Sequence, residues 1–60
     1  MNVPKIVTEY NTVVANFAEE LEFLELDPAE GGNVGSRVNQ IALNYNKDVS
    51  TVISDIRSWF

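Results

Sequence analysis

The stretch "GSRVNQIALNYNKDVSTV", residues 35–52, decides the fold, because it is compatible with two chain paths. It can form one unbroken helix whose polar side is rich in Asn, Ser and Thr. It can also form two helices joined by a tight turn at residues 46–48, which is the arrangement of a DNA-binding helix-turn-helix. The first interpretation predicts a self-associating helical protein, and the second predicts a small DNA-binding protein.

Hydrophobic periodicity favours the unbroken helix. The apolar residues of the second half lie within about 120° of one helical face: Val34, Val38, Ile41, Ala42, Tyr45, Val49, Val52, Ile53, Ile56, Trp59 and Phe60. This stripe crosses residues 46–48 without a change of phase, whereas the two helices of a helix-turn-helix normally keep separate phases. We therefore expect one helix over about residues 33–60, with Asn33 or Ser36 at its start.

A second apolar stripe predicts an earlier helix over about residues 4–26. Its members occupy one sector of a helix: Ile6, Tyr10, Val13, Val14, Phe17, Leu21 and Leu24. Pro4 suits the first turn of this helix. The intervening "LDPAEGGN", residues 26–33, predicts a loop, because Pro28 disfavours a helical Asp27 and two glycines make helix continuation costly.

The two stripes predict a single all-α domain, an antiparallel helical hairpin. One side of each stripe would stay exposed, and pairing two hairpins into a four-helix bundle would bury it. Sixty residues form only a marginal core. Without cysteine or histidine, neither a disulfide nor a typical zinc site can stabilise it, so we expect a homodimer. The core or dimer stripe would consist of Ile6, Tyr10, Val13, Phe17, Leu21, Leu24, Val38, Ile41, Tyr45, Val52 and Ile56. The alternative is a three-helix fold with a helix-turn-helix over residues 37–58.

The charges are unevenly distributed. The net charge is −5, and the first thirty residues hold seven acidic side chains against Lys5. An acidic surface repels nucleic acid, so any DNA contact would come from Arg37, Lys47 and Arg57 in the second half. We interpret the glutamates of the first helix as a solvated face, and attraction of a basic partner protein is the alternative.

Residues 34–46, "VGSRVNQIALNYN", carry the most specific pattern in the chain. It consists of an apolar residue, Gly, two polar residues, an apolar residue, Asn-Gln-Ile-Ala, three residues and Asn. The matching residues are Val34, Gly35, Val38, Asn39, Gln40, Ile41, Ala42 and Asn46. The segment resembles part of the MobC-type plasmid mobilisation proteins, which are accessory proteins of relaxosomes. The resemblance implies an association with DNA, although members of that family are generally larger and have a basic amino-terminal part, where this chain is acidic.

Catalysis is poorly served by this composition. Histidine and cysteine, the commonest base and the strongest nucleophile, are absent, and no spacing places a second group to activate a Ser or Tyr. We therefore expect no enzyme activity, no cofactor and no metal. No apolar run approaches the ~20 residues of a membrane span, and the amino end lacks a secretory pattern, so we expect a cytoplasmic protein.

The sequence thus predicts a non-catalytic, self-associating helical protein, such as a small phage- or plasmid-borne regulator or adaptor, that binds another protein. Phe23 and Leu43 point away from the stripes, and together with Trp59 they are the predicted partner contacts, because aromatic residues are enriched among interface hot spots. The alternative is a DNA-associated protein of the mobilisation type or a helix-turn-helix DNA binder.

Overall fold

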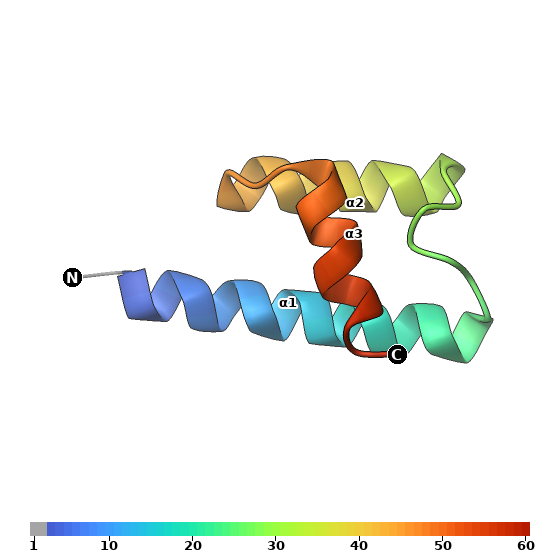
Figure 1. Ribbon diagram of the computed structural model, residues 1–60, viewed down its shortest axis with the longest axis horizontal. Helices are drawn as coiled ribbons and strands as arrows, with labels where there is room; N and C mark the ends of the chain where they lie inside the picture. The colour runs from blue at the N-terminus through green and yellow to red at the C-terminus, as the bar shows by residue number, and fades with distance from the viewer. Residues whose placement is uncertain (1–2) are drawn as a thin grey trace.

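Three helices make up the fold. The computed structural model describes the backbone of residues 3–60 and the side chains of residues 7–60. This part of the chain forms α1 (Val3–Leu24), α2 (Gly32–Tyr45) and α3 (Val49–Arg57), with no strand. α1 and α2 run in opposite directions, and α3 crosses from the end of α2 to α1 (Figure 1). The all-α class is confirmed, whereas the two-helix hairpin is wrong.

The predicted helix over residues 33–60 is interrupted at residues 46–48. Asn46 adopts the left-handed conformation, with φ 54° and ψ 50°. The N–H of Lys47 donates to the carbonyl of Ala42 at 2.9 Å, and the N–H of Asn46 donates to that of Leu43 at 3.4 Å. These two hydrogen bonds form a Schellman motif, which ends an α-helix. Asp48 is extended and precedes α3, so the three-helix path considered as the alternative is the observed one.

α1 ends in the same way, two residues earlier than expected. Glu25 is left-handed, with φ 58°. The N–H of Leu26 donates to the carbonyl of Leu21 at 2.9 Å, and the N–H of Glu25 donates to that of Glu22 at 3.2 Å. Leu26 thereby packs against the core, as the residue after a left-handed cap often does. Leu24 stays 51% exposed, so it is not part of the core of the single chain, and its place in a dimer stripe stays a prediction.

The loop between α1 and α2 lies where it was expected. The N–H of Ala29 donates to the Asp27 carboxylate at 3.0 Å, and Pro28 is buried. Gly31 and Gly32 have φ values of 88° and 58°, in the region that glycine occupies without a steric penalty. The two glycines therefore let the chain reverse into α2.

The core lies where α3 packs on both other helices. Its buried apolar side chains are Tyr10, Val14, Phe17, Ala18, Leu21, Val34, Val38, Ile41, Ala42, Val52 and Ile56, with Val13 and Tyr45 partly buried against them. The side chain of Ile6 lies outside the described residues. Val52 and Ile56 are completely buried within one chain. α3 thus covers the apolar face that was expected to require a second chain.

A polar cluster connects all three helices. The hydroxyl of Tyr10 on α1 donates a 2.5 Å hydrogen bond to the carboxylate of Asp55 on α3. Its ring meets that of Tyr45 on α2 edge to face, with 5.5 Å between centroids, and the Lys47 Nζ lies 4.7 Å from its centroid. Burial raises the pKa of the Tyr10 hydroxyl well above its ordinary value, and the bond to Asp55 raises it further. The hydroxyl therefore stays protonated and keeps donating.

Candidate functional site

The three cations predicted to contact DNA are engaged within the fold. The Arg37 guanidinium binds both oxygens of the Glu20 carboxylate, at 2.5 and 3.2 Å, and lies 4.3 Å from the centroid of the Phe17 ring. Arg57 reaches both oxygens of Asp27 at 3.2 Å. Lys47 lies over Tyr10, as described above. Because carboxylates neutralise Arg37 and Arg57, these two arginines add little positive potential to the surface.

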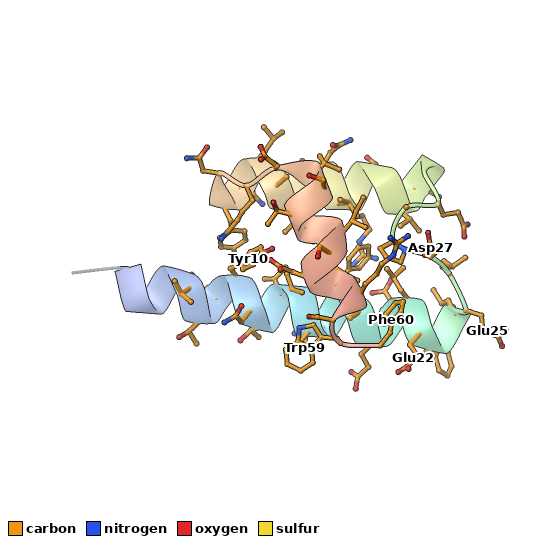
Figure 2. The ribbon with its side chains drawn as sticks, viewed as in Figure 1. Tyr10, Glu22, Glu25, Asp27, Trp59 and Phe60 are labelled. Carbon is orange, nitrogen blue, oxygen red and sulfur yellow. The ribbon has the colours of Figure 1, made fainter. Side chains whose placement is uncertain are left out.

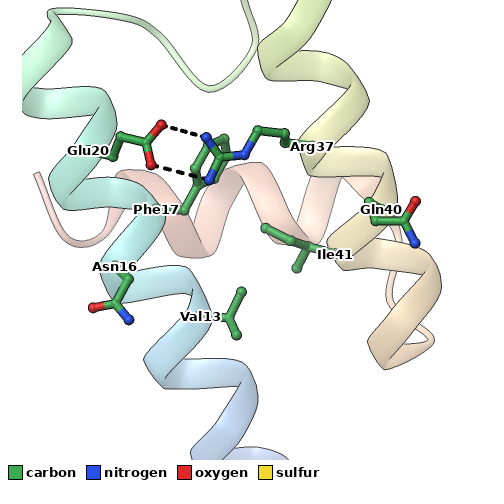
Figure 3. Close-up of a pocket in the computed structure, with 7 residues that line it drawn as sticks. All are labelled: Val13, Asn16, Phe17, Glu20, Arg37, Gln40 and Ile41. Atoms are coloured by element: carbon green, nitrogen blue, oxygen red, sulfur yellow. Dashed lines mark hydrogen bonds and ion pairs between the residues drawn. The ribbon is translucent and has the colours of Figure 1, made fainter.

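The ion pair between Arg37 and Glu20 also bounds a groove between α1 and α2 (Figure 3). The hydrogen bond from Arg37 lowers the pKa of the Glu20 carboxyl below its ordinary value. The groove has a volume of about 300 Å³ and is lined by Val13, Asn16, Phe17, Glu20, Arg37, Gln40 and Ile41. Phe17 and Ile41 in its lining are only 3% and 8% exposed, so these two side chains offer little apolar surface to a partner.

Large apolar side chains are exposed elsewhere. Phe23 is 85% exposed, Leu43 78% and Trp59 57%, and these are the three predicted partner contacts. The structure does not bring all three together. Phe23 lies near the end of α1 and Leu43 near the end of α2, at opposite ends of the molecule (Figure 1).

Trp59 lies against the outer face of α1. α3 ends at Arg57, and the N–H of Trp59 donates to the carbonyl of Ile56 at 3.0 Å, so the chain turns towards α1. The indole lines a hollow with Ala15, Asn16, Glu19 and Glu22 of that helix. Figure 2 shows Trp59 and Glu22 on the side of α1 that faces away from α2.

Phe23 belongs to the same outer face, because it follows Glu19 by four residues and such residues are neighbours on a helix. We call Glu19, Glu22, Phe23 and Trp59 the aromatic–acidic surface. Among the described residues, neither Glu19 nor Glu22 forms an ion pair. Both aromatic residues and the glutamates of this helix were considered from the sequence, but not that Trp59 lies beside Glu19 and Glu22, because only the turn after α2 directs α3 back across α1.

The segment that resembles mobilisation proteins forms α2 and its terminal turn. Val34, Val38, Ile41 and Ala42 are buried, and Asn46 is the left-handed cap. Comparison with protein-family models, curated proteins and solved structures gives no match. The packing of α2 accounts for these five residues, and the relationship to mobilisation proteins stays a prediction.

Neither a metal-binding cluster nor a membrane-spanning helix occurs in the described part of the chain. It contains no cluster of three or more acidic side chains arranged to hold a metal ion. None of its helices combines the length and the apolar character that a membrane span requires.

Proposed function

We propose that this chain is a non-catalytic helical interaction protein that binds another protein through its aromatic–acidic surface. The observation that carries the proposal is the exposure of Phe23 and Trp59 on one face of α1, at 85% and 57%. Aromatic side chains dominate the binding energy of many interfaces, and exposed apolar surface often marks such sites. The groove between α1 and α2 is the weaker candidate, because Phe17 and Ile41 in its lining are almost fully covered.

A different protein is favoured over a second copy. In a two-fold dimer the same patch of each copy enters the interface, so the Glu19 and Glu22 carboxylates of both copies would be brought close together. Like charges held together are unfavourable, and the chain already carries a net charge of −5. α3 also covers the apolar stripe that was expected to require a second chain, so that stripe does not favour a homodimer. We therefore propose a monomer that associates with a distinct partner.

Affinity capture from the source organism tests this proposal. The whole tagged chain is compared with Phe23→Ser/Trp59→Ser and with the control Leu43→Ser, which removes an exposed apolar side chain at the opposite end. Circular dichroism verifies that each variant keeps its helix content. We expect a protein that is retained by the wild type and the control and lost with the double variant. Equal capture by all three would refute the proposed surface.

DNA binding is the second candidate, and the three-residue connection between α2 and α3 is the observation that favours it. A helix-turn-helix has such a connection, and its second helix enters the major groove. α3 would then present Ser50, Thr51 and Ser54, which are exposed. Its only basic residue, Arg57, is bound to Asp27, whereas phosphate contacts by cations normally supply much of the affinity.

Titration with duplex DNA at two salt concentrations tests whether the protein binds DNA. Binding at low salt that weakens at higher salt, and weakens further in Arg57→Gln, would support it. A chain that binds no duplex at low salt is not a DNA-binding protein of this type.

A further inference from the structure

Resting on the proposed function, we infer that the partner presents a basic amphipathic segment to the aromatic–acidic surface. Its Lys or Arg side chains would meet Glu19, Glu22 and the indole of Trp59, while its apolar side chains would cover Phe23. Three observations about the charges and rings of this chain lead to that chemistry.

The first observation is the distribution of compensated charge. Glu20 is paired with Arg37, and Asp27 is paired with Arg57. Glu19 and Glu22, on the outer side of α1, form no ion pair with any described residue. The two arginines thus neutralise other carboxylates and leave a negative potential beside the exposed aromatic side chains.

The second observation concerns the aromatic rings. Arg37 lies over Phe17 at 4.3 Å, and Lys47 lies over Tyr10 at 4.7 Å, each within the range of a cation–π contact. Trp59 is the best cation acceptor of the aromatic residue types, yet no cation of the described residues covers its ring. A basic side chain from a partner would complete this contact.

The third observation is the position of the carboxylates relative to the indole. Glu19 and Glu22 line the same hollow as Trp59, so one bound cation can contact a carboxylate and the indole together. Phe23 provides an exposed apolar area on the same face of α1, one helical turn after Glu19. A nucleic acid or a second copy of this acidic chain would instead bring negative charge to the surface, which is unfavourable.

Trp59 is the only tryptophan, so its fluorescence reports directly on this surface. The whole chain is titrated with three amphipathic helical peptides that share the same leucine positions and carry lysine, glutamine or glutamate at the polar positions. We expect the lysine peptide to shift the emission to shorter wavelength and to bind more tightly than the other two. Its affinity should fall as salt rises, because exposed charges are screened.

A pair of charge-matched variants locates the effect. Glu19→Gln/Glu22→Gln should bind the lysine peptide about fivefold more weakly, as expected for losing two exposed ion pairs. Glu9→Gln/Asp48→Asn removes two exposed acidic charges elsewhere and should bind it like the wild type. Equal weakening in both variants would show an effect of net charge alone and would overturn the assignment.

The peptides also separate the two proposals. If the glutamine or glutamate peptide binds as tightly as the lysine peptide, and Phe23→Ser abolishes that binding, the surface binds proteins but does not select basic ones. The inference then fails and the proposed function stands. If none of the peptides shifts the emission and affinity capture also gives no partner, both proposals are refuted.

Discussion

Replacing Asn46 by alanine and by glycine tests the path of the chain, because the break and the unbroken helix predict opposite orders of stability for the two variants. In the observed fold Asn46 is left-handed, with φ 54°. Alanine in that conformation costs roughly 1–2 kcal/mol, and glycine avoids the penalty. Glycine loses more backbone freedom on folding, by roughly 0.5–1 kcal/mol relative to alanine. The glycine variant should therefore be more stable than the alanine variant by about 0.5–1 kcal/mol.

An unbroken helix through residue 46 predicts the opposite order. Inside a helix alanine is more favourable than glycine by about 1 kcal/mol. The free energy of unfolding of Asn46→Gly minus that of Asn46→Ala therefore differs by roughly 2 kcal/mol between the two chain paths. Domains of this size unfold with roughly 3–9 kcal/mol, so both variants should fold well enough to be compared.

Urea unfolding followed by far-UV circular dichroism measures this difference. With a slope of about 1 kcal/mol/M, the midpoint of Asn46→Gly should lie about 0.5–1 M above that of Asn46→Ala. Asn39 is an exposed asparagine inside α2 and serves as the control. There alanine should be the more stable variant, by about 1 kcal/mol. Finding alanine more stable at both positions would refute the break between α2 and α3.

Three further substitutions test the packing, the end of α1 and the polar cluster. Val52→Asp places a charge at a completely buried site and should abolish the helical circular dichroism signal. Ser50→Asp lies on the exposed side of α3 and should leave the signal unchanged. Similar spectra for the two variants would contradict the assigned buried face of α3. Glu25→Gly should raise the free energy of unfolding by about 0.5 kcal/mol, because Glu25 is left-handed. If urea unfolding shows the variant to be less stable than the wild type, that conformation is contradicted. Tyr10→Phe should lower the free energy of unfolding by about 1 kcal/mol at neutral pH, because the hydrogen bond to Asp55 is lost. Folding raises the pKa of Tyr10 above its ordinary 10.0, so the free energy of unfolding of the wild type should fall as pH rises above that value. Tyr10→Phe should lose less stability over the same pH range. Parallel curves of unfolding free energy against pH would contradict a protonated, buried Tyr10.

The break at Asn46 shows where sequence reasoning was weakest. The local chemistry of the turn was visible, because Asn tolerates the left-handed conformation and Asp suits the start of a helix. Periodicity favoured the wrong path because α2 and α3 both direct apolar residues into one core. The spacing of seven from Tyr45 to Val52 then preserves the phase across the turn. A three-residue connection can satisfy this spacing without being helical, so phase continuity alone does not establish a continuous helix.

The candidate site was predictable in part for the same reason. Phe23 and Leu43 lie off their stripes, and their exposure follows from helical geometry alone. Trp59 falls on the stripe, yet it is 57% exposed because α3 ends before it. Its place beside Glu19 depends on tertiary structure, since residues forty positions apart meet only after α3 has crossed α1.

The position of α3 also has a consequence for hydrogen exchange. α1 and α2 make most of their helix–helix contacts with this nine-residue helix rather than with each other. Neither longer helix can keep its buried face away from water once α3 detaches, so their central amides should become accessible to deuterium in one concerted opening. Protection factors across all three helices should therefore converge on a single value, and weakening α3 should lower them together.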